Sequence, residues 1–182
     1  VIAQLFIYPI KSCGGIEVTQ AQLTATGLSM DREWMIVDQD GMFLTQRQIP
    51  HMVWITPVLT PTALTLSAPG VAPVSIALEL PSSPKTVTVW RDTLLGDDQG
   101  DTVAQWLERY LAVPGKHYRL IRFSKQARRL SSLDWTKGVE AVNKFSDGFA
   151  VLVVTQSALD ELNTRLRSQG HEAVLMSRFR PN

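Results

Sequence analysis

Short segments of alternating apolar and polar residues, separated by turn residues at close intervals, limit the folds open to this chain. Six such segments lie within the first hundred positions and are predicted to be strands: Val1–Ile7, Val18–Leu23, Glu33–Val37, Leu64–Ser67, Val74–Leu78 and Thr86–Trp90. Turn signals separate them, among them Gly14–Gly15, Asp38–Gly41 and Pro81–Pro84. This spacing favours a barrel or a sandwich over βαβ units.

The pattern changes at Gly100–Asp101, where a helix is predicted. Asp101 is suited to cap it, and its apolar positions recur at helical spacing: Val103, Trp106, Leu107, Tyr110 and Leu111. Pro114–Gly115 ends this helix, and a strand is predicted at Tyr118–Phe123. The polar, basic stretch 124–146 is interpreted as a loop that joins two domains, with room for one short strand.

Beyond the loop, the continuous apolar run Phe149–Val154 predicts a buried strand. A second helix is predicted over Ala158–Arg167, with Thr155 as its N-cap and Gly170 as its stop. A last strand, Ala173–Met176, leads into the final residues. We therefore expect a mainly β protein with a few helices (α+β), divided into domains at 1–123 and 124–182.

Charge and cysteine content exclude several classes of protein. The 18 basic and 17 acidic residues give a net charge of +1, so no overall field favours nucleic acid or an anionic membrane, and any anion site must be local. The single cysteine, Cys13, excludes an internal disulfide framework, and the three histidines show no metal-ligand spacing. No apolar run of membrane-spanning length and no signal peptide are seen, so we expect a soluble, unprocessed protein in a reducing compartment.

Two segments of the first domain present cations at turns. Lys11 and Ser12 follow a predicted strand and enter a turn with two glycines, which would suit a phosphate. From spacing alone, an ordinary turn with a solvated lysine is the favoured interpretation. Cys13 beside them is interpreted as a small packed residue. Two guanidinium nitrogens of Arg32 can contact a phosphate, or the guanidinium can pair with Asp31. When this motif is considered by itself, the ion pair is favoured.

Two further segments of the second domain could hold an anion. Thr155 and Ser157 lie at a predicted helix N-terminus, where free N–H groups favour anions, although capping alone explains Thr155. Arg178 and Arg180 would share one face of an extended segment, as an anion clamp or as a basic edge. The residues alone thus indicate a β-rich protein that binds an anion.

Five motifs, taken in order, resemble one family closely. They are Tyr-Pro-Ile-Lys-Ser-Cys-Gly-Gly-Ile at 8–16, Asp-Arg-Glu-Trp-Met-Ile-Val-Asp at 31–38, Phe-Leu-Thr-Gln-Arg-Gln at 43–48, Gly-Asp-x-x-Ala-x-Trp-Leu at 100–107 and Phe-Arg-Pro-Asn at 179–182. Together they resemble the MOSC family, which includes bacterial YcbX-like proteins, the mitochondrial amidoxime-reducing component and the C-terminal part of molybdenum cofactor sulfurase. The resemblance implies an N-terminal MOSC-type β-barrel followed by part of a second, MOSC, β-barrel.

The resemblance also implies a cofactor and a reaction. Family members bind the molybdenum cofactor, a molybdopterin, and the reductase branch reduces N-hydroxylated small molecules such as amidoximes. It implies that the cofactor is held by Lys11, Ser12, Arg32, Thr155, Ser157, Arg180 and Asn182. A ferredoxin-like or flavin-dependent protein would be the electron donor, and the location would be the bacterial cytoplasm.

One feature departs from the family pattern. The cysteine expected to ligate molybdenum lies beyond Phe-Arg-Pro-Asn, and Cys13 is in the wrong motif to replace it. We therefore expect these residues to be part of a longer protein and inactive alone, and no catalytic or metal-ligating residue is assigned. Two alternatives stay open: a sulfurase or sulfur-carrier role, with sulfur received from a pyridoxal-phosphate enzyme, and a non-catalytic binding module.

Overall fold

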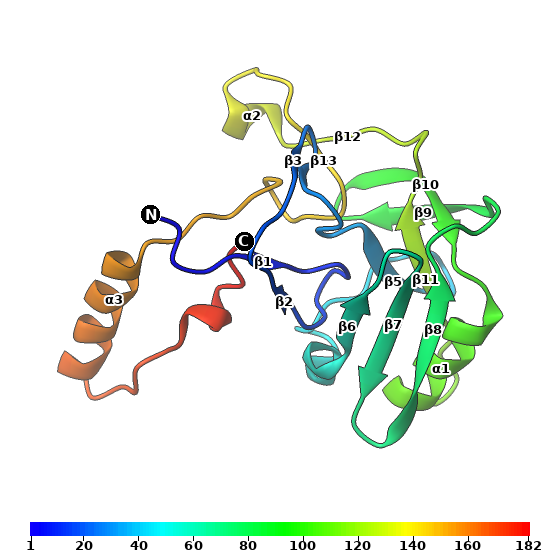
Figure 1. The fold of residues 1–182 in the computed structure, drawn as a ribbon, viewed down its shortest axis with the longest axis horizontal. Helices are drawn as coiled ribbons and strands as arrows, with labels where there is room; N and C mark the ends of the chain where they lie inside the picture. Colours follow the sequence, from blue (N-terminus) through cyan, green and yellow to red (C-terminus); the bar gives the residue numbers. More distant parts are fainter.

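Two antiparallel sheets form the body of the structure, a computed structural model that describes residues 1–182 (Figure 1). The larger sheet has the strand order β5-β11-β10-β9, with β5 at Trp34–Asp38, β11 at Tyr118–Phe123, β10 at Asp92–Asp98 and β9 at Pro84–Val89. The second sheet has the order β6-β7-β8, with β6 at Thr56–Leu59, β7 at Ala63–Ala68 and β8 at Val71–Ala77.

Shorter elements complete the fold. Three two-stranded pairs join β1 (Phe6–Ile7) to β2 (Ile16–Glu17), β3 (Leu23–Thr24) to β4 (Gly27–Leu28), and β12 (Arg129–Leu130) to β13 (Val142–Asn143). The helices are α1 (Asp101–Leu111), α2 (Leu133–Thr136) and α3 (Gln156–Ser168), with 3₁₀ helices at Pro50–Trp54 and Met176–Arg178. The prediction of a β-rich α+β fold is confirmed. No helix is both long and apolar enough to cross a membrane.

Strand β5 is buried on both faces, which explains its unbroken apolar sequence. Trp34 and Ile36 point into a core formed with the second sheet and α1, whereas Met35 and Val37 point into a smaller cluster on the opposite face. Phe145, from the segment after β13, fills that smaller cluster and is fully buried. A segment after residue 123 therefore packs back against the larger sheet. The predicted domain boundary at 123/124 stays a prediction.

Most strand predictions in the body are confirmed, and two strands were missed. Strands β5, β7, β8, β9 and β11 all fall on predicted segments. Strands β6 and β10 were not predicted. In β10, a Cβ at Gly96 would lie 2.2 Å from the Cγ2 atom of Ile121. This glycine therefore permits close approach to β11, although glycine is unfavourable in strand sequences.

Four strand predictions are wrong or too long. Of Val1–Ile7 only Phe6–Ile7 pairs, and Val18–Leu23 gives way to the short strands β2 and β3 around it. Phe149–Val154 is not a strand, since no neighbouring strand pairs with it and Val153 is 79% exposed. Ala173–Met176 is not a strand either. The backbone N–H and C=O of Val174 are hydrogen-bonded to the side-chain amide of Asn163 and not to a neighbouring strand.

Both predicted helices form, with one change at a cap. Gly100, not Asp101, is the N-cap of α1, and the Asp101 carboxylate instead accepts a hydrogen bond from Arg119 at 2.6 Å. The apolar residues of α1 are buried in the main core, as predicted, except that Tyr110 is only partly buried. The Thr155 hydroxyl caps α3 by accepting from the Ala158 N–H at 3.2 Å, and Gly170 follows that helix with a φ of 79°.

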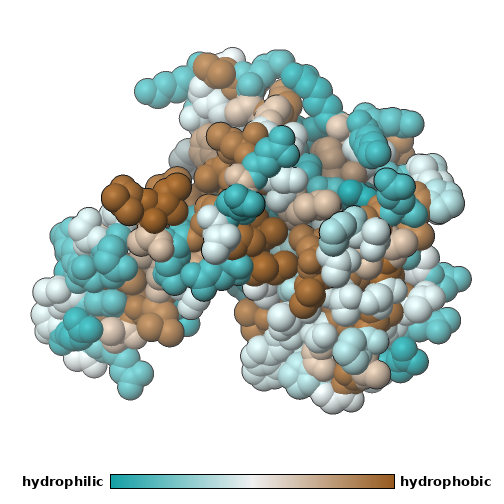
Figure 2. Space-filling view, in the orientation of Figure 1, coloured by the Kyte–Doolittle hydropathy of each residue, from teal (hydrophilic) through white to brown (hydrophobic).

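Helix α3 stands beside the barrel, and the two bodies meet through the chain ends. In Figure 1 it lies apart from the sheets, and the C-terminus lies close to β1. Figure 2 shows apolar surface gathered between the α3 lobe and the barrel. Asn182 links these parts, because its backbone N–H donates to Leu152 O at 2.9 Å and its side chain donates to Phe6 O at 3.3 Å.

Candidate functional site

A pocket of about 360 Å³ opens where four segments of the chain, at 11–12, 45–47, 146–152 and 179–182, meet Arg32 and Trp90. Five of the seven predicted site residues line it, namely Lys11, Ser12, Arg32, Arg180 and Asn182. The structure thus brings together residues that are up to 171 positions apart, Lys11 and Asn182.

Thr155 and Ser157 do not line this pocket. They lie at the N-terminus of α3, where their hydroxyl oxygens are 3.1 Å apart and Thr155 caps the helix. The structure therefore separates these two residues from the other five, and their cofactor contacts stay a prediction.

Lys11 is a buried cation held by oxygen atoms and aromatic rings. Its Nζ donates to Phe145 O at 3.0 Å and to the carboxylate of Asp147. The rings of Trp90 and Phe43 lie 5.5 and 5.6 Å from that nitrogen. Burial lowers the pKa of Lys11, and the Asp147 carboxylate opposes this shift. The alternative of a solvated lysine is excluded, because Lys11 is only 5% exposed.

Arg32 and Arg180 share the ring of Tyr8. The centres of their guanidinium groups lie 4.4 and 4.3 Å from the ring centroid. Arg32 donates to both carboxylate oxygens of Asp31 at 2.7 Å and to the backbone oxygen of Arg180 at 3.1 Å. The predicted pair between Asp31 and Arg32 therefore forms, and it fixes the guanidinium at the pocket wall.

The guanidinium of Arg180 has no hydrogen-bond acceptor and no acidic partner within the protein. The guanidinium stacks on Tyr8, and the backbone oxygen of Arg180 accepts a hydrogen bond from Arg32. Burial and the nearby charge of Arg32 lower the pKa of Arg180, although a guanidinium stays protonated at neutral pH. A partly buried cation with five unused N–H donors is suited to bind an anion in this pocket.

Left-handed backbone conformations are concentrated at the pocket. Seven non-glycine residues have a positive φ, and four of them line it: Ser12 at 65°, Arg32 at 43°, Trp90 at 55° and Arg180 at 54°. Each such conformation costs of the order of 1–3 kcal/mol and persists only where the surrounding structure enforces it. These turns direct the four side chains toward one pocket.

A buried arginine holds the loop that supplies Asp147. Arg129 is 6% exposed and donates to the side chain of Asn143 at 2.8 Å and to the backbone oxygens of Lys144 and Ser146 at 2.8 and 2.7 Å. Burial alone would raise the pKa of Asp147, but the charge of Lys11 and its hydrogen bond lower it below the usual range. Asp147 is therefore an ionised partner for Lys11.

Sequence reasoning missed several residues at this site. Gln46 and Arg47 line the pocket, and the signal for them was the motif at 43–48, which carried the resemblance but no assigned role. Arg47 is exposed and forms no ion pair. Asp147 and Trp90 carried no local signal, because only the tertiary fold brings them to Lys11.

The donor set fits a phosphate-bearing group but provides no metal ligand. Four cations, Lys11, Arg32, Arg47 and Arg180, face a single carboxylate, Asp147. The hydroxyl of Ser146, which also lines the pocket, is the one buried side-chain polar atom without a hydrogen-bond partner. Cys13 is fully buried in the core, as predicted, and burial raises its pKa to about 12, so it is no thiolate ligand here.

Comparisons with known proteins identify relatives over the whole chain. The chain is 34% identical over its whole length to "Mitochondrial amidoxime reducing component 2" of Rattus norvegicus and covers 55% of that protein. It is 32% identical to "Mitochondrial amidoxime-reducing component 1" of Homo sapiens, covering 54% of it, and 31% identical to "Molybdenum cofactor sulfurase" of Bos taurus, covering 22% of it. The chain thus spans about half the length of the amidoxime-reducing relatives.

A family profile described as "MOSC N-terminal beta barrel domain" matches residues 1–114. This range contains both sheets except β11, and it contains Lys11, Ser12 and Arg32 of the pocket. The chain therefore belongs to the family of proteins with a MOSC N-terminal β-barrel domain.

Proposed function

We propose that the pocket binds the phosphate-bearing pterin of the molybdenum cofactor and that the complete protein reduces N-hydroxylated small molecules. The observation that carries this proposal is the convergence of Lys11, Arg32 and Arg180 on one pocket in which the Arg180 guanidinium has no protein acceptor. The names of the relatives, amidoxime-reducing components and a molybdenum cofactor sulfurase, support it.

Each pocket residue has a part in this proposal. Arg180 would donate directly to phosphate oxygens, since its donors are unused. Lys11 and Arg32 would supply positive charge from fixed positions, because each is held by a carboxylate. The backbone turn at Ser12 would bring its N–H and hydroxyl to the same anion. Asn182 would hold the segment 179–182 against β1.

When bound, the cofactor would supply two electrons that, with two protons, convert an N–OH group into N–H and release water. The chain would bind and orient the cofactor and exclude water from its anionic end. A ferredoxin-like or flavin-dependent protein is proposed as the electron donor, and the cytoplasm as the location. Fractionation of the native host tests the location.

The test is molybdenum content of the complete protein expressed in a host that makes the cofactor. We expect stoichiometric molybdenum and reduction of benzamidoxime to benzamidine. Arg180→Ala should lower retained molybdenum by about tenfold or more, since one charge-assisted hydrogen bond contributes roughly 1.5–3 kcal/mol. Arg165→Ala is the matched control, because Arg165 is 74% exposed on α3 and lies outside the pocket. A complete protein without molybdenum would overturn the proposal.

A sulfurase or sulfur-carrier role is the second candidate, supported by the similarity to molybdenum cofactor sulfurase. The complete protein would then transfer sulfur from a pyridoxal-phosphate enzyme to the bound cofactor. Loaded protein that restores activity to a desulfurated molybdenum enzyme, but does not reduce amidoximes, would favour this role. Protein that binds no cofactor but still binds a redox partner would instead favour a binding module.

A further inference from the structure

A broad groove of about 850 Å³ opens beside the proposed cofactor pocket. One wall comes from the segment 46–53 of the barrel, with the 3₁₀ helix Pro50–Trp54, and the other from the segment 173–180 after α3, with the 3₁₀ helix Met176–Arg178. Gln46, Arg47 and Arg180 line both the groove and the pocket, so the two spaces adjoin. A molecule in the groove would therefore lie next to the contents of the pocket.

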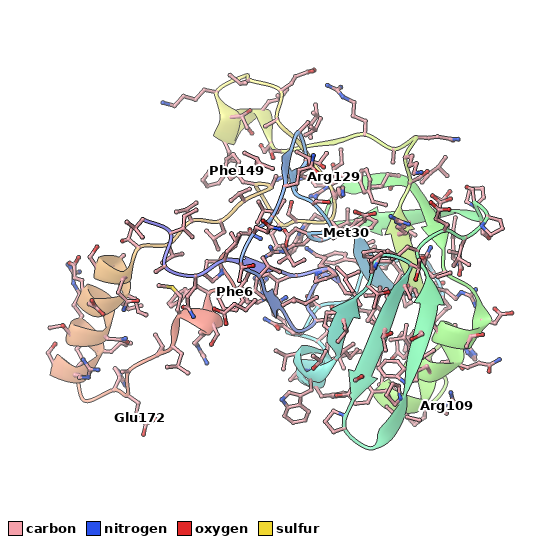
Figure 3. All side chains as sticks on the ribbon, viewed as in Figure 1. Phe6, Met30, Arg109, Arg129, Phe149 and Glu172 are labelled. Atoms are coloured by element: carbon pink, nitrogen blue, oxygen red, sulfur yellow. The ribbon has the colours of Figure 1, made fainter.

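Three arginines line this groove, and no acidic residue does: Arg47, Arg178 and Arg180. Arg47 and Arg178 are exposed and form no ion pair. The acidic residue that precedes the second wall in the sequence, Glu172, is exposed at the outer end of the α3 lobe (Figure 3). Since the net charge of the chain is only +1, this arginine groove concentrates positive charge at one place on an otherwise balanced protein.

Exposed apolar side chains belong to the same groove. Val53 is 41% exposed on one wall, and Leu175 is 76% exposed on the other. Trp54, next to Val53 in the chain, is 61% exposed. Arginine and tryptophan are enriched where proteins bind one another, and apolar surface beside charged residues is typical of such interfaces. The arginine groove therefore has the composition of a surface that binds another protein.

We propose that the arginine groove is the docking surface for the acidic face of an electron-donor protein. This inference rests on the proposed function, because a donor docked there would lie beside the cofactor. Three cations without acidic partners are complementary to a carboxylate-rich surface. A nucleic acid or an anionic membrane would need positive charge over a wider face, whereas the 18 basic and 17 acidic residues nearly balance over the whole chain.

The docked partner would supply electrons one at a time. Each reduced one-electron donor is oxidised as it transfers its electron, so two dockings supply the two electrons that, with two protons, convert N–OH into N–H and water. The first donor must leave before the second arrives. A small interface dominated by charge permits this exchange, because such complexes form rapidly and bind weakly.

Binding of an acidic redox protein to the complete protein, made in a host that lacks the cofactor, tests the surface directly. The probe is a plant-type ferredoxin, whose surface is acidic, titrated calorimetrically at low salt. We expect binding that weakens as salt is added, and that weakens about tenfold in Arg178→Glu but little in Arg178→Lys. Arg109→Glu is the matched control, since Arg109 is exposed, forms no ion pair and lies on α1, across the barrel from the α3 lobe (Figure 3).

Three results of this titration would overturn the proposal. The first is no binding of ferredoxin, which would also be seen if the rest of the complete protein covered the groove. The second is equal weakening by Arg178→Glu and Arg109→Glu. The third is binding to phosphatidylserine vesicles that depends on Arg178, without binding to ferredoxin, which would assign the groove to a membrane.

A second measurement separates the docking surface from the cofactor site. The complete, loaded protein is given benzamidoxime and either reduced ferredoxin or reduced methyl viologen, a small cation that needs no basic docking surface. We expect Arg178→Glu to lower the ferredoxin-dependent rate about tenfold and to leave the methyl viologen-dependent rate unchanged, because Arg178 lies outside the cofactor pocket. Equal losses with both donors would overturn the docking role. A complete protein without molybdenum that still binds ferredoxin through Arg178 would overturn the proposed function and leave the docking surface standing.

Discussion

The ammonium of Lys11 donates a hydrogen bond to the carboxylate of Asp147, which lies 136 positions later in the chain. The lysine is buried, whereas the side chain of Asp147 is 69% exposed at the rim of the pocket. The pair therefore ties the first turn of the barrel to the loop after β13.

Removing the charge of Asp147 should destabilise the fold moderately. In Asp147→Asn the buried ammonium of Lys11 keeps only the carbonyl of Phe145 as a strong acceptor. We expect the free energy of unfolding to fall by about 1–2 kcal/mol, less than for a fully buried pair, because water screens the exposed carboxylate. Urea unfolding measures this, and Asp160→Asn on the surface of α3 is the control. Equal stability of the two variants would show that the pair contributes nothing.

The buried guanidinium of Arg129 should matter more to stability than its neighbour on the surface. Arg129→Met leaves the oxygens of Asn143, Lys144 and Ser146 without their donor, and we expect a loss of about 3 kcal/mol. Arg128→Met should cost less than about 0.5 kcal/mol, since Arg128 is 59% exposed and pairs only with Glu140. Thermal unfolding of both variants gives the comparison, and similar losses would contradict the role assigned to Arg129.

Stability should fall in acid through Glu33. Burial alone would raise the pKa of Glu33, but its hydrogen bonds and ion pairs with Lys144 and Arg122 lower it below the usual range. A carboxyl with a lowered folded-state pKa stabilises the protein above its unfolded pKa, near 4.3, and this stabilisation is lost as the pH falls through the folded value. Glu33→Gln should thus cost roughly 2–3 kcal/mol at pH 6 and progressively less toward pH 3.

Urea unfolding of wild type and Glu33→Gln at several pH values measures that dependence. Glu161→Gln is the control, because Glu161 is 65% exposed in a surface pair with Arg165. A difference between wild type and Glu33→Gln that stays constant from pH 6 to pH 3 would show that the effect is packing and not ionisation.

Alanine at Gly27 should destabilise the fold by a clash with Ala150, which lies between the pocket residues Phe149 and Val151. The φ of Gly27 is 103°, and an added Cβ would lie 2.7 Å from the backbone oxygen of Ala150. Two effects contribute at Gly27, the strain of a positive φ and the clash with Ala150. Gly70→Ala measures the first effect alone, because Gly70 has a φ of 78° and nothing within 4 Å of an added Cβ. We expect Gly70→Ala to cost about 1 kcal/mol and Gly27→Ala at least about 2 kcal/mol more than that, as measured by thermal unfolding. Equal losses of stability in the two variants would mean that the backbone at Ala150 shifts to relieve the clash.

The sequence predicted correctly those helices and strands that are determined by residues within the element itself. Helix α3 follows from its own cap at Thr155, and β5 follows from an apolar run that is buried on both faces. The strand predicted at Phe149–Val154 did not form: three of its residues, Phe149, Val151 and Leu152, line a pocket, and Val153 is exposed to solvent. A run of apolar residues indicates burial, but it does not indicate which part of the protein packs against those residues.

The pocket was predictable only in part for the same reason. Motifs marked Lys11, Arg32 and Arg180, since unusual turns carry a local signature of glycines, prolines and charges. The partner Asp147 and the supporting Arg129 lie in a polar stretch without periodicity, and only the folded chain brings them to the site. Thr155 carried an anion-binding signal, yet helix capping fully explains it.

The left-handed residues at the pocket have a consequence for attempts to make this protein more heat-resistant. Glycine would relieve the backbone at Ser12, Arg32, Trp90 and Arg180, so a screen for thermal tolerance alone should enrich glycine or asparagine at these positions. Each such replacement would also delete a side chain that faces the pocket. Selection for heat resistance would therefore favour glycine or asparagine at these four positions, whereas selection for ligand binding would favour the residues now present.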